Sequence, residues 1–176
     1  MTEKIQGKLV TLRPATMQDR RPIFDWLTNS DLTSSMMGPP IYADGKIPSW
    51  EEFKEDYKEY FFDSTQPQLG RCFIIEVNGE PVGQINHDRI YPEDKSTELD
   101  IWLKSSMYTG KGYGSDALQT LCAFLNVGYS CNKFIIAPSK RNTRAIKAYK
   151  KAGFVESAEP IRSPDYFDTV VLVKTL

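Results

Sequence analysis

The chain has 176 residues, of which 40% are hydrophobic and 26% charged, and its 22 basic and 23 acidic side chains leave a net charge of -1. This length predicts a single domain over residues 1–176 with a substantial core. The balanced charge argues against nucleic acid or an anionic membrane as a partner. Residues 1–10 lack the apolar run of a signal peptide, and no segment is long enough to span a bilayer, so we expect a cytoplasmic protein.

Cysteine and histidine are too few to suggest a metal centre. The three cysteines, Cys72, Cys122 and Cys131, cannot all pair and match no metal motif, so we expect reduced thiols. The single histidine, His87, excludes a His-rich zinc site, and we interpret it as a structural polar residue. No metal is therefore expected.

The first part of the chain predicts one strand, two helices and a loop. Residues 8–15, "KLVTLRPA", alternate apolar and polar side chains as a half-buried strand does, and a helix is expected to open near Thr16. Residues 36–48 are rich in glycine and proline and predict a loop. Ser49 and Glu52 have the spacing of a capping box, which predicts a second helix.

The next elements are strands. Residues 71–91 contain two apolar runs around Asn78 and Gly79, a pair suited to the positive φ angles of a tight hairpin turn. A third strand follows at residues 97–103, "TELDIWL". We therefore expect an antiparallel meander in this part of the chain.

Three glycines at alternate positions, Gly110, Gly112 and Gly114, lead into a helix with apolar residues at helical spacing. Flexible backbone at a helix N-terminus is typical of a phosphate-binding turn, because its amides and the positive end of the helix dipole face an anion. The spacing fits neither a Walker A loop nor the G-x-G-x-x-G dinucleotide fingerprint. From these residues alone, an ordinary glycine-rich turn remains an alternative.

After that helix the sequence predicts a strand at 133–138, a helix at 142–152 stopped by Gly153, and a last strand at 168–174. Antiparallel strands are thus followed by alternating strands and helices. This order favours an α/β (α+β) fold, with helices on the faces of a mixed, mostly antiparallel sheet.

Two segments together resemble the GNAT superfamily of acetyl-CoA-dependent N-acetyltransferases. They are 109–114, "TGKGYG", and 142–154, which contains Asn142, Ala145, Tyr149 and a Gly-Phe pair. The resemblance implies a GNAT fold of about seven strands and about four helices, with the pyrophosphate of coenzyme A as the bound phosphate. It implies acetyl-CoA contacts at these positions: Leu103, Lys104, Thr109, Gly110, Lys111, Gly112, Tyr113, Gly114, Ser115, Asn142, Ala145 and Tyr149. Lys111, Lys140 and Arg141 are expected to help neutralise the phosphates.

The resemblance also implies catalytic roles. Tyr149 matches the family tyrosine that points at the cofactor sulfur, which would make it the acid that protonates the departing thiolate. By strand alternation Glu98, Asp100 and Trp102 share one face, so the base is expected among these acids. Asp100 is the first choice, Glu98 or a water molecule held by a carboxylate the alternative, and backbone amides near Leu103 and Lys104 are expected to bind the thioester carbonyl.

Among GNAT branches, the motif pattern is most similar to the aminoglycoside 6'-N-acetyltransferases, which implies a small-molecule amine acceptor and a role in antibiotic resistance. Ala137-Pro138 stands where that branch has Asp-Pro. A ribosomal-protein-type N-terminal acetyltransferase is an alternative, because its openings resemble residues 8–19. A non-catalytic acetyl-CoA-binding sensor is another alternative. The family implies a monomer or a homodimer.

Overall fold

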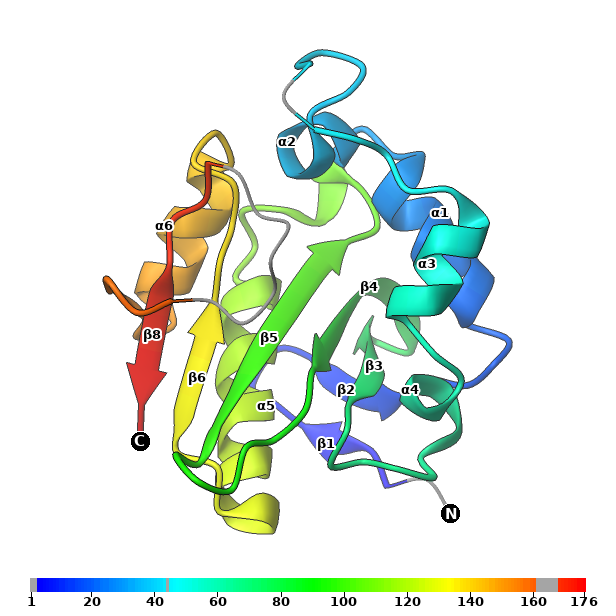
Figure 1. Ribbon diagram of the computed structural model, residues 1–176. Helices are drawn as coiled ribbons and strands as arrows, with labels where there is room; N and C mark the ends of the chain where they lie inside the picture. The colour runs from blue at the N-terminus through cyan, green and yellow to red at the C-terminus, as the bar shows by residue number, and fades with distance from the viewer. Residues whose placement is uncertain (1–2, 44, 161–167) are drawn as a thin grey trace.

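A computed structural model describes residues 3–43, 45–160 and 168–176. Within these ranges the strands form one eight-stranded open sheet in the order β1-β2-β3-β4-β5-β6-β8-β7, and α-helices cover its two faces (Figure 1). The strands are β1 (Ile5–Gln6), β2 (Thr11–Pro14), β3 (Arg71–Val77), β4 (Glu80–His87), β5 (Ser96–Leu103), β6 (Lys133–Ile136), β7 (Val155–Glu156) and β8 (Leu172–Thr175). The helices are α1 (Arg20–Thr28), α2 (Thr33–Met37), α3 (Trp50–Asp56), α4 (Tyr60–Asp63), α5 (Tyr113–Tyr129) and α6 (Thr143–Lys151), with a 3-10 turn at Ser106–Tyr108.

The mixed, mostly antiparallel sheet is confirmed, and the described residues hold more elements than the resemblance implied. The additional strands are very short, since β1 and β7 have two residues each. The loop expected at 36–48 begins inside α2, and the last strand begins at Leu172 rather than at residue 168. In the part of the chain that the structure describes, no helix is long and apolar enough to cross a membrane.

Local sequence signals explain several element boundaries. Asn78 and Gly79 have φ angles of 51° and 81°, which suit the tight turn between β3 and β4. Ser49 and Glu52 form the expected capping box at the start of α3. Gly153 has a φ of 97° and follows the end of α6, as a left-handed C-terminal residue does.

Two hydrophobic cores hold the helices against the sheet. One lies between the sheet and α5, and its fully buried members include Leu118, Leu121 and Phe134. The other lies between the opposite face and α1, α3 and α4, and includes Ile23 and Phe53. Burial of such large side chains contributes roughly 1.5–3 kcal/mol each, so both helical layers are firmly attached to the sheet.

The sheet opens between β5 and β6. These two strands pair in parallel only from Ser96 with Lys133 to Glu98 with Ile135, whereas β5 continues to Leu103 beside β4. Figure 1 shows the two strands diverging beyond this point. The second half of β5 therefore presents its free edge to an opening, and α6 lies beyond that opening.

Candidate active site

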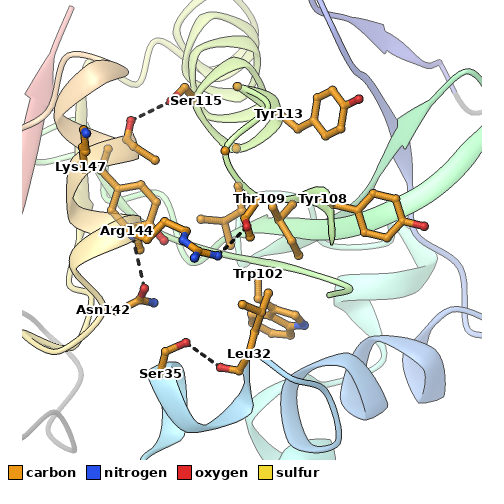
Figure 2. A pocket seen from close by; sticks show the side chains of 18 of the residues that line it. Leu32, Ser35, Trp102, Tyr108, Thr109, Tyr113, Ser115, Asn142, Arg144 and Lys147 are labelled. Carbon is orange, nitrogen blue, oxygen red and sulfur yellow. Dashed lines mark hydrogen bonds between the residues drawn. The ribbon is translucent and has the colours of Figure 1, made fainter. Parts of the chain in front are cut away.

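A cavity of about 520 Å³ occupies this opening (Figure 2). Its wall is formed by the end of β5, the glycine turn, the first turn of α5, one face of α6, and residues of α2 and its N-cap. Leu103, Thr109, Gly110, Gly112, Tyr113, Gly114, Ser115, Asn142, Ala145 and Tyr149 all line it. The structure thus brings together ten of the twelve residues expected to contact a cofactor.

The glycine turn has the conformation of an anion cradle. Gly110 and Gly112 have φ angles of 72° and 84°, in the left-handed region that favours glycine. Gly112 is the N-cap of the 17-residue helix α5, and no side chain caps this end. A Cβ built on Gly110 would meet nothing within 4 Å, so a ligand can approach the backbone closely. The first amides of α5 are therefore available to an anion such as a phosphate.

The cations of this cavity come from α6. Arg144, Lys147 and Lys151 line it, at a spacing that places them along one helix face. Of the cations expected from the sequence, Lys140 pairs with Asp168 at 3.1 Å and Arg141 stacks over the ring of Tyr42 at 4.7 Å. Neither is part of the lining.

One expectation for a backbone amide is corrected, at Lys104, whereas the role of Lys111 stays a prediction. The amide of Lys104 donates to the carbonyl of Val82 at 2.8 Å, so the sheet already uses it, and Lys104 lies outside the cavity lining. Because N–H groups alternate in direction along an antiparallel ladder, the amide of Leu103 points to the opposite edge, toward the opening. Lys111 is exposed in the turn and lies outside the lining, although its neighbours Gly110 and Gly112 belong to it.

Hydrogen bonds join α6 to the rest of the site. The side chain of Asn142 accepts from the amide of Ala145 at 3.3 Å and thereby caps α6. Ser115 donates to the carbonyl of Ala148 at 2.8 Å and links α5 to α6. These contacts hold Tyr149, which follows Ala148, in the wall of the cavity.

A second cavity, of about 550 Å³, lies on the other side of Tyr149. Four carboxylates line it, from Asp56, Asp88, Glu98 and Asp100, together with Phe53, Tyr57 and Tyr60. Lys46 and Arg89 also contribute to the lining, but Lys46 pairs with Glu52 and Arg89 lies 5.6 Å from the ring of Tyr91. The charge of this cavity is therefore net negative.

Two hydrogen bonds hold the carboxylate of Asp100. Its Oδ1 accepts from the amide of Ile101 at 2.9 Å, and its Oδ2 accepts from the hydroxyl of Tyr57 at 3.2 Å. Burial raises the pKa of Asp100 to about 6, with a smaller contribution from Glu98, against the opposing effect of the two hydrogen bonds. At neutral pH Asp100 is ionised and has the basicity that a general base requires.

Asp88 lies beside Asp100 at the mouth of the second cavity. Burial is the largest cause that raises the pKa of Asp88, and the carboxylates of Asp100, Glu98 and Asp56 raise it further. The side chain is nevertheless exposed to solvent, and water moderates such a shift. Asp88 thus adds negative charge to the cavity, whereas Asp100 is the better placed proton acceptor.

Tyr149 lines both cavities and is only 8% exposed. Burial, and to a lesser degree the charge of Asp100, raises the pKa of Tyr149 well above its ordinary value. The phenol therefore stays protonated across the physiological range and can donate a proton. His87 lies outside the lining of both cavities and is fully buried, with Nδ1 2.9 Å from the carbonyl of Asp88 and its pKa lowered by burial to about 4, which fits a structural role.

Sequence reasoning missed Asp88 of the second cavity and Arg144, Lys147 and Lys151 of the first. The three cations could have been predicted as a group, because their spacing puts them on one face of a helix that was predicted correctly. Asp88 follows the end of β4 and Asp56 ends α3, so no shared periodicity connects them.

Comparisons with known proteins identify the family and similar enzymes. The acetyltransferase (GNAT) domain family model matches residues 10–155. Aminoglycoside N(6')-acetyltransferase type 1 of Klebsiella pneumoniae is 27% identical over 168 residues, covering 89% of this chain and 78% of that protein.

Two solved structures have a similar fold over almost the whole chain. AAC(6')-Ib in complex with paromomycin and acetyl-CoA has a TM-score of 0.72 at 26% identity, covering 96% of this chain and 94% of that one. RimL, a ribosomal L7/L12 alpha-N-protein acetyltransferase in complex with coenzyme A, has a TM-score of 0.74 at 20% identity, covering 99% and 98%. At this lower identity the second likeness concerns the fold alone.

Proposed function

Because the chain belongs to the GNAT acetyltransferase family and is an acetyl-CoA-dependent N-acetyltransferase, we propose that it acetylates a primary amine of a small polycationic molecule by direct transfer. An aminoglycoside-like compound is the acceptor we favour. The observation that carries this proposal is the second cavity, where four carboxylates surround the approach to Tyr149. The name of the Klebsiella pneumoniae relative supports the same acceptor class.

The first cavity fits acetyl-CoA, which supplies the acetyl group as an activated thioester. The turn from Gly110 to Ser115 offers backbone amides to phosphate oxygens, and the α6 cations add positive charge beside it. The free edge of β5 at Leu103 directs an amide into the opening, where it can stabilise negative charge on a carbonyl oxygen. The cavity thus offers amides, positive charge and a free strand edge to a phosphorylated thioester.

We assign the two proton transfers to Asp100 and Tyr149, which both line the second cavity. Asp100, with its pKa raised to about 6, accepts a proton from the acceptor amine at Oδ1 or Oδ2. Tyr149, which is buried and protonated, donates the proton of its hydroxyl to the leaving sulfur. Glu98 lies in the same cavity as Asp100 and is the alternative base, acting directly or through a water molecule.

Acceptor charge is recognised by the remaining carboxylates. Ala137 and Pro138 line the second cavity, so the position where the aminoglycoside 6'-acetyltransferases have an acid is apolar here. Asp56 and Asp88 supply negative charge from α3 and from the end of β4 instead. A substrate with several ammonium groups satisfies these carboxylates better than one with a single amine.

The test is release of coenzyme A, followed with a thiol reagent, across aminoglycosides, polyamines, amino acids and N-terminal peptides. We expect turnover with aminoglycosides. We also expect Asp88→Asn and Asp56→Asn to raise the acceptor KM while leaving the acetyl-CoA KM unchanged. Asp25→Asn is the matched control, because this α1 carboxylate pairs with Arg21 at 3.1 Å and lies outside both cavity linings.

Other outcomes of this panel would select the alternatives. Turnover with peptides alone would point to an N-terminal protein acetyltransferase and contradict the small-molecule proposal. Binding of acetyl-CoA without turnover of any amine in the panel would instead favour a sensor. A cytoplasmic location and a monomeric or homodimeric state stay predictions, to be checked by fractionation and by light scattering.

A further inference from the structure

A row of three side chains crosses the sheet at Asp100. Cys72 on β3 pairs with Asn86 on β4, and Asn86 pairs with Asp100 on β5, three strands that lie side by side in Figure 1. Residues directly opposite each other in antiparallel strands point to the same face, with Cβ atoms about 5 Å apart. Asn86 is therefore a direct neighbour of Asp100, on the face of the sheet where Cys72 packs in the core with α1, α3 and α4.

Asn86 carries a buried acceptor without a donor. The residue is 1% exposed, and its Oδ1 has no hydrogen-bond partner among the residues that the structure describes. A buried polar atom left unpaired is costly, so each case in a folded protein requires an explanation. Asp100 offers no donor while it is ionised, because a carboxylate only accepts, but it gains an O–H donor when it is protonated. Protonation of Asp100 thus creates a donor next to the unpaired Oδ1.

The ionised form of Asp100 has partners of its own. Its Oδ1 accepts from the amide of Ile101 at 2.9 Å, and its Oδ2 accepts from the hydroxyl of Tyr57 at 3.2 Å. Both bonds favour the charged form, whereas an acceptor beside the carboxyl favours the neutral form. A general base passes through both forms in every catalytic cycle. The surroundings of Asp100 therefore suit each of its two states.

We propose that Asn86 is the positioning residue of the base: once Asp100 has taken a proton from the acceptor amine, its O–H donates to Oδ1 of Asn86. The proton passes from the amine nitrogen to a carboxylate oxygen as the nitrogen lone pair attacks the thioester carbonyl, and it returns to solvent afterwards. Because Asn86 stabilises the protonated form, it increases the basicity of Asp100. The inference rests on the proposed role of Asp100 and adds the group that holds its proton.

Other titratable and charged groups surround Asp100, and the test leaves all of them in place. They are Glu98 on β5, Asp88 after β4, Cys72 on β3, Arg20 on α1, Asp56 and Tyr57 at the end of α3, Tyr60 on α4, Tyr149 on α6, and Lys46 and Arg89 in loops. These groups are the same in the wild type and in a variant of Asn86. A difference between the two proteins in the titration of Asp100 therefore reports the contribution of Asn86.

The experiment replaces Asn86 with leucine, which has a similar shape and no acceptor. Carbon-13 NMR of protein labelled at the aspartate carboxyl carbons follows the titration of Asp100 from pH 4 to 8, and Asp100→Asn assigns the signal. The wild type should titrate near pH 6, and Asn86→Leu about half to one pH unit lower, as for loss of one neutral hydrogen bond. Asn86 is already shielded from water, so leucine adds no burial that would oppose this shift.

The pH profile of kcat/KM gives a second readout, measured with the best acceptor of the amine panel. In Asn86→Leu the fall in activity at acid pH should move down by the same half to one unit. Activity at pH 8 should drop about twofold to threefold, because the base is weaker. Asn86→Val also lacks an acceptor and suits a strand, so it provides the same readouts if the leucine variant does not fold.

Gln84→Met is the matched control. Gln84 lies two residues before Asn86 on the same face of β4, is fully buried, and has both amide atoms unpaired among the described residues. It lies opposite Trp102 rather than Asp100. Both substitutions remove an unpaired buried amide, so both should raise the urea midpoint, but Gln84→Met should leave the titration of Asp100 unchanged.

Four results would overturn the proposal. An unchanged titration in Asn86→Leu would show that Asn86 does not hold the proton, and a titration moved to higher pH would mean that its amide donates to the carboxylate instead. An equal shift in Gln84→Met would indicate a general response of the strand. Loss of activity by the same factor at every pH would mark a structural role. Full activity in Asp100→Asn would refute the base itself, and the NMR titration would still decide the contact with Asn86 separately.

Discussion

Replacing Asp100 with asparagine separates the effect of this carboxylate on stability from its effect on catalysis. Asparagine has the same shape and keeps an oxygen that can accept from the amide of Ile101, so the local structure should survive. What disappears is the negative charge that burial disfavours. We therefore expect Asp100→Asn to lose activity and gain stability at neutral pH.

The stability gain follows from the pKa. Burial raises the pKa of Asp100 from an ordinary 3.8 to about 6, and each pH unit of difference corresponds to about 1.4 kcal/mol. The upper limit is therefore about 3 kcal/mol, and because the side chain is only partly buried we expect about 1–2 kcal/mol.

The sign of the pH dependence is defined by the same shift. As pH rises from about 4 to about 6, the unfolded chain releases this proton while the folded protein still holds it. The unfolded state then binds fewer protons, so stability falls across this window and stays lower above it. In Asp100→Asn this component of the fall is absent, so the variant should gain on the wild type between pH 4 and 6.

The assay is urea unfolding of both proteins from pH 4 to 8, paired with kcat/KM from coenzyme A release over the same range. The activity of the wild type should fall below about pH 6 as Asp100 is protonated, and the variant should lose about 10²-fold or more at neutral pH. A stability difference independent of pH would refute the buried charge. Loss of less than tenfold activity would refute the base.

Three further predictions concern the acid, the glycine turn and a helix cap. Tyr149→Phe should lower kcat about 10²-fold with the Kd for acetyl-CoA within about twofold, since it removes one proton donor; full kcat would contradict the acid role. Gly112→Ala should lower stability by about 1–2 kcal/mol and weaken acetyl-CoA binding, because φ is 84° and the new Cβ would lie 3.2 Å from Leu9. The control is Gly128→Ala, whose Cβ would have nothing within 4 Å and which should stabilise α5 in thermal unfolding. Ser49→Ala should cost about 1 kcal/mol in urea unfolding with an unchanged m-value, because the capping box is lost; an unchanged midpoint would show that the cap contributes nothing.

Much of the fold was predictable because its signals are local. A turn at Asn78 and Gly79 needs two residues that tolerate positive φ, and a capping box needs two residues three apart. The number of elements was less predictable, because β1 and β7 have two residues each and exist only through their partners. Such short strands leave no periodicity to read.

The lining of the first cavity was predictable for the same reason, apart from the amide of Lys104. The glycine turn and Asn142 belong to contiguous motifs, and the structure places both in one cavity. Lys104 was misplaced because ladder register decides which amides a sheet uses, and here Val82 takes that amide. Lys140 lies close to the motif in sequence and pairs with Asp168 in the structure, so its expected role toward the phosphates stays a prediction.

The acceptor side could not be read from any single segment, because its charge is assembled by the fold. Asp56 ends α3, Asp88 follows β4, and Glu98 and Asp100 lie on β5, so three separate parts of the chain meet around one cavity. They meet beside Tyr149 because β5 leaves β6 after Glu98, which opens the sheet where α6 brings the phenol. That divergence places a proton acceptor, Asp100, and a proton donor, Tyr149, in the lining of the same cavity. It also explains how a single tyrosine can serve both the cofactor cavity and the acidic one.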